Sequence, residues 1–96
     1  QNSALETRGD AALKLWPNPN RGDLLNVSLL VPEELNTITM DIFDLSGTRV
    51  STRTIPAQGG VLSAVVVLSN DLAAGMYMVN ITVGERTYTQ RLVIQP

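Results

Sequence analysis

The 96-residue sequence contains no cysteine and no histidine, and this double absence excludes most of the chemistry that a small domain can carry out. Without these side chains the chain cannot assemble a Ser-His-Asp or a Cys-His nucleophile system. It also lacks the usual ligands of a zinc site and can form no disulfide. We therefore expect no catalytic residue, no metal site and no cofactor, and we expect that the chain is not an enzyme.

Positive charge and long apolar runs are scarce as well. Seven Lys and Arg side chains stand against nine Asp and Glu, which gives a net charge of −2. Nucleic-acid-binding domains usually present a basic patch, so we expect no nucleic-acid partner. The longest apolar run, Ala64–Leu68, has the length of a strand. A membrane-spanning helix needs roughly 20 apolar residues, so the sequence predicts no transmembrane segment.

The composition that remains is that of one globular domain. Apolar residues make up 44% of the chain and charged residues 17%. A chain of this length can bury roughly two-thirds of its unfolded surface, which is enough for a single core. Aromatic residues are only 4%, so the core must consist mainly of Val, Leu and Ile.

The first eleven residues differ from the rest. Residues 1–11 are polar and show no sustained period, which indicates a linker. The chain begins with neither Met nor a signal peptide. We therefore expect it to be the C-terminal part of a longer protein, with the folded domain over residues 12–96.

From residue 12 onward, apolar and polar side chains alternate in short runs, as is typical of half-buried strands. The polar segment Arg49–Thr54 is expected to be an edge strand, whereas Val61–Leu68 is aliphatic and predicts a strand buried on both faces. The remaining strands are expected near residues 13–15, 25–31, 38–42, 77–83 and 87–94. About seven strands at this spacing predict an all-β antiparallel sandwich.

Three turn motifs separate these runs. Asp44-Leu45-Ser46-Gly47 combines an Asp that can bond the backbone two residues on with a Gly that tolerates positive φ. Gln58-Gly59-Gly60 is expected to begin a second turn. Gly84-Glu85 is a two-residue hairpin loop with Gly first, which favours a type II′ turn.

Several short motifs suggest binding, but each has a plainer explanation. Asn18, Asn20 and Asp23 form an oxygen-rich loop, yet calcium requires six to eight oxygens and an ordinary turn with Asx bonds is the better interpretation. Arg-Gly-Asp occurs at residues 8–10 and 21–23, where integrin binding competes with simple turn and linker composition. The N-glycosylation patterns at Asn26 and Asn80 fall in the middle of expected strands.

Three blocks of sequence together resemble a known family. The first is Leu15–Gly22, with Pro17, Asn18 and Pro19, and the second is Ile38–Val50, with Asp44 and Gly47. The third is Leu72–Pro96, which contains Leu-x-x-Gly-x-Tyr, two strands around a Gly-Glu turn, and a basic residue before an aliphatic triplet. Their order resembles the C-terminal sorting domain of proteins exported by the bacterial type IX secretion system, over roughly residues 12–96.

The resemblance implies an immunoglobulin-like β-sandwich that acts as an address label for an upstream cargo protein, to which residues 1–11 would be the linker. Its implied partners are the type IX translocon and a sortase that removes the domain. Its implied location is the periplasm in transit, followed by the cell surface or the medium.

Within this resemblance, the residues expected to be recognised by the secretion machinery are Gly75, Tyr77, Arg91, Leu92, Val93 and Ile94. The residues expected to maintain the family motifs are Pro17, Asn18, Pro19, Asp44, Gly47 and Gly84. Arg91 is the strongest candidate for receptor contact, because core packing gives no reason for a guanidinium in the last strand. We also hypothesise that this last strand has an open edge that pairs with a receptor strand.

Gly75 and Tyr77 also have structural explanations. Gly75 would let the backbone enter its strand without a side-chain clash. Tyr77 would fill core volume and bond a backbone group through its hydroxyl.

An immunoglobulin-like or fibronectin-like accessory spacer or adhesion module remains the alternative function. The two functions differ in the position they require, because a sorting domain must lie at the extreme C-terminus of its protein and a spacer can lie anywhere.

Overall fold

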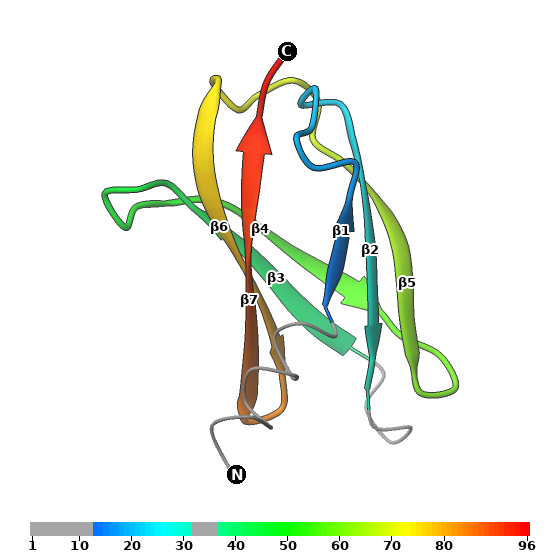
Figure 1. Cartoon of the computed structure of the whole chain (residues 1–96). Coiled ribbons are helices and arrows are strands. Elements are labelled where there is room, and N and C mark those ends of the chain that lie inside the picture. Colours follow the sequence, from blue (N-terminus) through cyan, green and yellow to red (C-terminus); the bar gives the residue numbers. More distant parts are fainter. Residues whose placement is uncertain (1–12, 32–36) are drawn as a thin grey trace, which may run out of the picture.

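The computed structural model describes residues 13–31 and 37–96, which form two antiparallel sheets packed face to face (Figure 1). The expected all-β sandwich of seven strands is therefore confirmed. In chain order the strands are β1 (Lys14–Trp16), β2 (Leu24–Leu30), β3 (Thr37–Phe43), β4 (Arg49–Pro56), β5 (Val61–Val67), β6 (Gly75–Val83) and β7 (Arg86–Ile94). The expected linker over residues 1–11 and the domain start at residue 12 lie outside the described residues.

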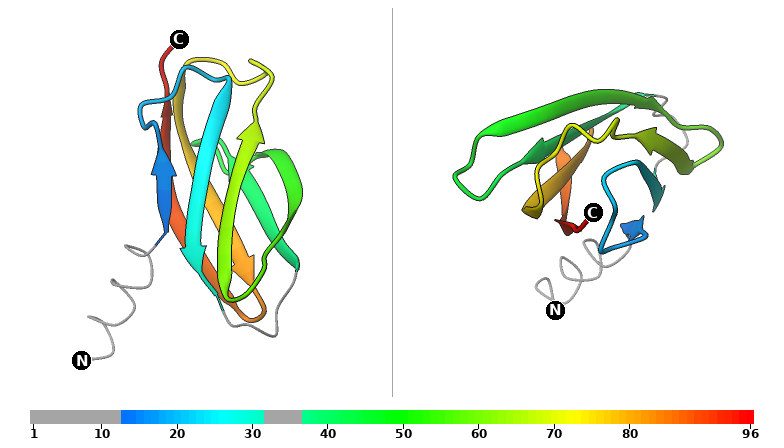
Figure 2. Two further views of the ribbon diagram at one scale, coloured as in Figure 1. Left: turned by 90° about the vertical axis from the view of Figure 1, so that its right-hand side faces the viewer. Right: turned by 90° about the horizontal axis from the view of Figure 1, so that it is seen from above.

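The two sheets are unequal in size. One has three strands in the order β1-β2-β5, and the other has four in the order β4-β3-β6-β7 (Figure 2). Strands β1 and β7 meet along one side of the sandwich, and β4 and β5 approach each other along the opposite side. The sandwich therefore has four edge strands, two on each side.

The core is the set of side chains that point between the sheets. Alternation places Leu25, Val27 and Leu29 of β2 inside, and the same pattern buries Tyr77, Val79, Ile81 and Val83 of β6. The largest fully buried side chains are all aliphatic or Met: Leu13, Leu25, Leu29, Ile38, Met40, Ile42, Leu62, Ile81, Leu92, Ile94, Val27 and Val79. The expectation of a core without a large aromatic contribution is confirmed.

Strand β5 corrects one expectation. We predicted that Val61–Leu68 is buried on both faces, but only alternate residues are buried, and Val61, Val65 and Val67 are exposed. The reason is that β5 lies in the three-stranded sheet, whose outer face is not covered by another layer in the described structure (Figure 2). Continuous apolar character therefore did not mean two buried faces here.

The three expected turns are confirmed. Gly84 has a φ of +60° between the paired residues Val83 and Arg86, as the first position of a type II′ turn requires. Gly59 and Gly60 both have positive φ within the turn that joins Gln58 to Val61. The Asp44–Gly47 turn closes the β3–β4 hairpin, and the N–H of its Gly donates to the carbonyl of its Asp at 3.0 Å.

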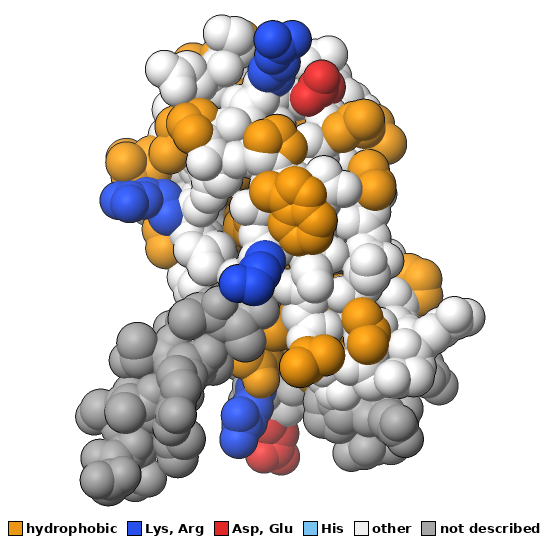
Figure 3. All heavy atoms as spheres, turned by 45° about the vertical axis from the view of Figure 1, so that its right-hand side comes forward, with side chains coloured by type: hydrophobic (Ala, Val, Ile, Leu, Met, Phe, Trp, Pro, Cys, Tyr) orange, Lys and Arg blue, Asp and Glu red, His pale blue; other side chains and the backbone are white. Residues whose placement is uncertain are grey.

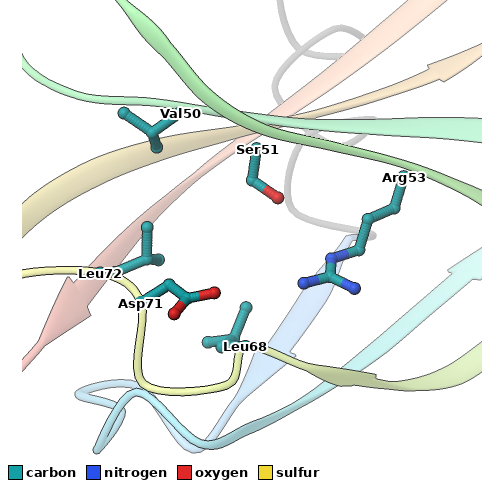
Figure 4. Close-up of a pocket in the computed structure, with 6 residues that line it drawn as sticks. All are labelled: Val50, Ser51, Arg53, Leu68, Asp71 and Leu72. Carbon is teal, nitrogen blue, oxygen red and sulfur yellow. The ribbon is translucent and has the colours of Figure 1, made fainter.

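The edge strand β4 is also confirmed, and it carries an arginine on its inner side. Arg53 lies opposite the buried Met40, so its side chain points between the sheets. Figure 4 shows the guanidinium entering a small gap that also faces Leu68, Asp71 and Leu72 of the loop after β5. Arg53 Nε is buried there without a hydrogen-bond partner. A buried donor without a partner costs stability.

We predict that Arg53→Met stabilises the domain. Methionine retains the packing of the arginine stem and removes the unsatisfied donor, so the free energy of unfolding should rise by about 1 kcal/mol in urea titrations. Arg86→Met is the matched control. Arg86 is exposed at the start of β7, so the change should stay within about 0.5 kcal/mol. A clear loss of stability in Arg53→Met would contradict the assignment.

Candidate functional site

Most of the residues singled out from the sequence lie together at one end of the sandwich. The end of β7, the start of β6 and the segment that follows β1 meet there, near the C-terminus of the chain (Figure 1). We call residues Pro17–Asn20 the proline segment. Both of its prolines follow cis peptide bonds, and β1 ends directly before it. As expected, the prolines end the strand pairing of β1.

Asn18 attaches the proline segment to the last strand. Its Nδ2 donates to the carbonyl oxygen of Arg91 at 2.7 Å, and its Oδ1 accepts from the N–H of Val93 at 3.0 Å. One amide side chain thus satisfies a backbone acceptor and a backbone donor on the same edge of β7. The Asn18 side chain thus makes the two hydrogen bonds that a backbone residue of a neighbouring strand would otherwise make.

Asn20 continues this pairing with its backbone. Its N–H donates to the carbonyl of Val93 and its carbonyl accepts from Gln95, both at 2.7 Å, in a short parallel bridge. Its side chain is fully buried, and Nδ2 donates to the carbonyls of Pro17 and Leu24 at 3.1 and 2.8 Å. Oδ1 accepts from Gly22, so every polar atom of the side chain is bonded.

These contacts correct the hypothesis of an open terminal edge. On the outer edge of β7, the carbonyl of Arg91, both backbone groups of Val93 and the N–H of Gln95 are already bonded by Asn18 and Asn20. Gln90 adds a further contact, because its Nε2 donates to the carbonyl of Leu13 beside β1. A receptor strand cannot add to this stretch of β7 without first displacing the proline segment.

Gly75 and Tyr77 begin β6 beside the end of β7, where they pair with Ile94 and Leu92. Gly75 has a φ of +149°, and a Cβ placed there would meet nothing within 4 Å. The expectation that Gly75 lets the backbone enter its strand therefore holds through this φ, which L residues rarely adopt, and not through space occupied by another element. The expected bond of Tyr77 is confirmed, because its hydroxyl donates to the carbonyl of Ala73 at 2.7 Å.

The candidate recognition residues of β7 divide between the two faces of the sheet. Leu92 and Ile94 are buried at 0% and 2% exposure and pack in the core. Arg91 and Val93 point to the outer face, where Arg91 lies opposite Met78 of β6 and Met78 lies opposite Phe43 of β3. Of these four candidates on β7, only Arg91 is exposed to solvent, and Val93 is half-buried.

Three of the predicted motif residues lie elsewhere. Gly84 is in the β6–β7 turn at the opposite end of β7, and Gly47 has a φ of +90° in the β3–β4 hairpin. Asp44 of that hairpin accepts bonds through Oδ1 from the Ser46 hydroxyl at 2.6 Å and from the N–H groups of Ser46 and Thr48. These bonds, that of the Ser46 hydroxyl above all, lower the pKa of Asp44. Asp44 therefore maintains a turn.

The weaker binding motifs are also accounted for. The oxygen-rich loop is a turn in which Oδ1 of Asn20 accepts the N–H of Gly22, an Asx bond. The Oδ1 atoms of Asn18 and Asp23 are also bonded, to the N–H groups of Val93 and Leu24. Gly22 provides the bend of the second Arg-Gly-Asp with a φ of +95° and is itself buried. The first copy lies outside the described residues. Asn26 and Asn80 are half-buried within β2 and β6.

The arrangement holds parts of the chain together and offers little for a reaction. Over residues 13–31 and 37–96, no cluster of three or more acidic, His or Cys side chains is placed to hold a metal ion. Instead, two of the three sequence blocks that suggested a family, Leu15–Gly22 and the end of Leu72–Pro96, are joined by direct hydrogen bonds.

Comparison with protein families agrees with this pattern. The family model described as the secretion system C-terminal sorting domain matches residues 14–95. The chain belongs to this family. It is thus a C-terminal sorting domain of type IX secretion, a family that is not catalytic and whose members direct export to the cell surface or the medium. No curated protein matches its sequence significantly.

In the described part of the sorting domain, no helix has the length and apolar character needed to cross a membrane. Sequence reasoning assigned Asn20 to an ordinary Asx turn in preference to a calcium site, and it did not identify the contact of Asn20 with the end of β7. The available signal was an Asn directly before Arg-Gly, a context that favours an Asx turn, but its contact with residues 93–95 depends on the tertiary fold.

We predict that the two asparagines differ in their effect on stability. Asn20→Ala leaves two carbonyls and one N–H without partners in a buried site, so the free energy of unfolding should fall by roughly 2–4 kcal/mol. Asn18→Ala should cost only about 1 kcal/mol, because its partners on β7 can bond water. Urea titrations monitored by Trp16 fluorescence measure both. Equal losses would contradict the distinction between a buried and an exposed amide.

We also predict that Ser46→Ala raises the pKa of Asp44 towards its ordinary value, as measured by carboxyl-carbon NMR titration. Because the folded-state pKa is lowered, the contribution of Asp44 to stability is present above its unfolded-state pKa. It is lost as the pH falls through the folded-state value. Ser46→Ala should therefore weaken this acid dependence. Thr52→Ala, within β4, is the control and should leave the Asp44 titration unchanged.

Proposed function

We propose that this domain is the signal by which an upstream cargo protein crosses the outer membrane through the type IX translocon. A sortase then removes the domain and leaves the cargo at the cell surface or in the medium. Membership of the sorting-domain family supports the general role. The bonding of the proline segment to the end of β7 supports the more specific proposal that the translocon recognises this end as one folded unit.

Accessibility separates the candidate residues from one another. The translocon would meet the domain folded, so buried Leu92 and Ile94 act on recognition by shaping the backbone and not by contact. The hydroxyl of Tyr77 is bonded to Ala73, and this residue likewise supports the loop that precedes β6. Arg91 carries the exposed side chain of the group, since Gly75 is exposed but has no side chain, and the carbonyl of Arg91 is fixed by Asn18. We therefore assign recognition to Arg91 and the surface around it.

That surface has a definite chemical character. Phe43 and Met78 lie between Arg91 and the exposed Arg49 in one row across all four strands of the larger sheet. Met76, 39% exposed, and Val93 pair in the next row. A receptor that fits it combines an apolar contact with a carboxylate for Arg91, since a guanidinium binds carboxylates in a directed geometry.

The proposal predicts that Arg91→Ala blocks export without unfolding the domain. The chain is fused to a fluorescent protein that carries a signal peptide and is produced in a bacterium with a type IX system. The fraction of reporter outside the cells should fall about tenfold, as expected for the loss of one charged contact worth about 1.4 kcal/mol. Arg86→Ala is the matched control, because Arg86 is exposed on the same strand at its other end.

Tyr77→Phe separates folding from recognition. It removes the bond to Ala73 and should cost about 1 kcal/mol of stability, while the exposed surface around Arg91 and its export are kept. Export that is equally efficient with Arg91→Ala and with wild type would refute recognition at Arg91. Wild-type reporter trapped in the periplasm would refute the sorting signal itself and favour an accessory module.

A further inference from the structure

The four edge strands of the sandwich are not equally protected against pairing with another strand. An exposed sheet edge is usually shielded by short length, by charge, by proline, by a bulge or by a covering segment. Strand β1 has only three residues and ends at Pro17, and the outer edge of β7 is bonded by the proline segment. Strand β4 carries two arginines, ends at Pro56 and has a bulge opposite Phe43.

Among the residues that the structure describes, strand β5 has none of these protections. Its seven residues, Val61–Val67, include no charged residue and no proline, and its register with β2 is unbroken. In Figure 1, β5 is the outermost strand of its sheet. Val61, Val65 and Val67 are 42%, 60% and 53% exposed, and hydrophobic side chains gather over the same sheet in Figure 3. Such an edge is a template for a further strand.

The hydrogen bonds at the ends of the β2–β5 ladder identify the free backbone groups. Leu68 donates to Asp23 at 2.7 Å and Val31 donates to Gly60 at 2.9 Å, so these two pairs are directly bonded. Bonded and non-bonded pairs alternate in an antiparallel ladder. Leu62, Ala64 and Val66 therefore bond β2, whereas Ser63, Val65 and Val67 direct their N–H and carbonyl groups away from it. Val61 also faces outward, but both of its groups are bonded to Gln58.

We propose that β5 pairs with β5 of a second copy of this chain, antiparallel and centred on Val65. In this register Val65 lies opposite Val65 of the second copy, and Ser63 lies opposite Val67. All the outward groups of these three residues then find partners, and no other two-fold register achieves this. The two three-stranded sheets become one sheet of six strands related by a two-fold axis.

The side chains of β5 favour this occupant. No charge meets a like charge across the axis, since Val61–Val67 carries none. On the inner face, small Ala64 lies opposite the larger Val66 of the second copy, and on the outer face valine meets valine or serine. A hollow lined by Pro56, Gln58, Val61 and Ser63 adjoins the edge. This hollow leaves room for the second copy at the point where the chain of that copy leaves its own β5, at Ser69 and Asn70, which both have positive φ.

Sedimentation equilibrium over a range of protein concentrations tests the association. The edge contact is small, so we expect a reversible rise in mass from 10.4 kDa towards twice that value as the concentration increases. Val65→Lys places two ammonium groups together at the axis and should weaken association at least about tenfold. Leu30→Lys should not, because Leu30 is 73% exposed on the same outer face but on the central strand β2.

Cysteine cross-linking tests the register, and the chain has no cysteine of its own. Val65→Cys should give a covalent dimer with a short bifunctional thiol reagent, because directly bonded antiparallel pairs have Cα atoms about 5.5 Å apart. Ser63→Cys should not, since its equivalent lies four residues away along the strand, roughly 13 Å. A mixture of Ser63→Cys and Val67→Cys should cross-link again.

Two results would overturn the proposal. One is a mass of 10.4 kDa at every concentration together with equal cross-linking of Val65→Cys and Ser63→Cys. The other is an association that Val65→Lys leaves unchanged, which would place the contact elsewhere. Because every variant lies on an exposed position of β5 or β2, circular dichroism spectra matching wild type should confirm that each one folds.

Discussion

The bonds between the proline segment and the outer edge of β7 are the constraint on which this end of the domain depends. The last strand of a sandwich has only one neighbour in its own sheet, so its outer backbone groups would otherwise lie open to water or to another chain. Asn18 and Asn20 bond four of these groups. The prolines assist because they cannot donate to a ladder, so the side chain of Asn18 takes the place of a backbone partner. The first sequence block, Leu15–Gly22, is therefore needed to complete the hydrogen bonding of β7 in the last block.

The same bonds make the sandwich asymmetric. On the side of β1 and β7, the edges of the two sheets are connected by Gln90, Asn18 and Asn20. On the side of β4 and β5, the sheets approach with Arg53 between them and no hydrogen bond to its Nε. The side of β1 and β7 is therefore suited to present a fixed surface. The side of β4 and β5 can still form contacts with another chain.

Much of the fold could be predicted from the sequence because apolar and polar side chains alternate clearly, with a period of two residues, in β2, β3 and β6. Leu25, Val27 and Leu29 indicated their buried face without reference to any other strand. Turn residues were equally informative, since Asp44, Gly47 and Gly84 each act through their own backbone or that of near neighbours. Strand β5 could not be predicted in the same way. Its exposed valines look identical to buried ones, and only the sheet order reveals that one face has no covering layer.

The candidate site was less predictable for a related reason. Arg91, Tyr77 and Asn18 were visible as candidates, but their roles depend on contacts over as many as 75 residues of sequence, as in the bond from Val93 to Asn18. A propensity or a motif carries no information on such a contact. Burial separates the group further, because Leu92 and Ile94 cannot face a receptor while the core is intact. The aliphatic triplet Leu92–Ile94 therefore meets two physical requirements, core packing and a place on the surface. Alternation along the strand places Leu92 and Ile94 in the core and Val93 on the outer face.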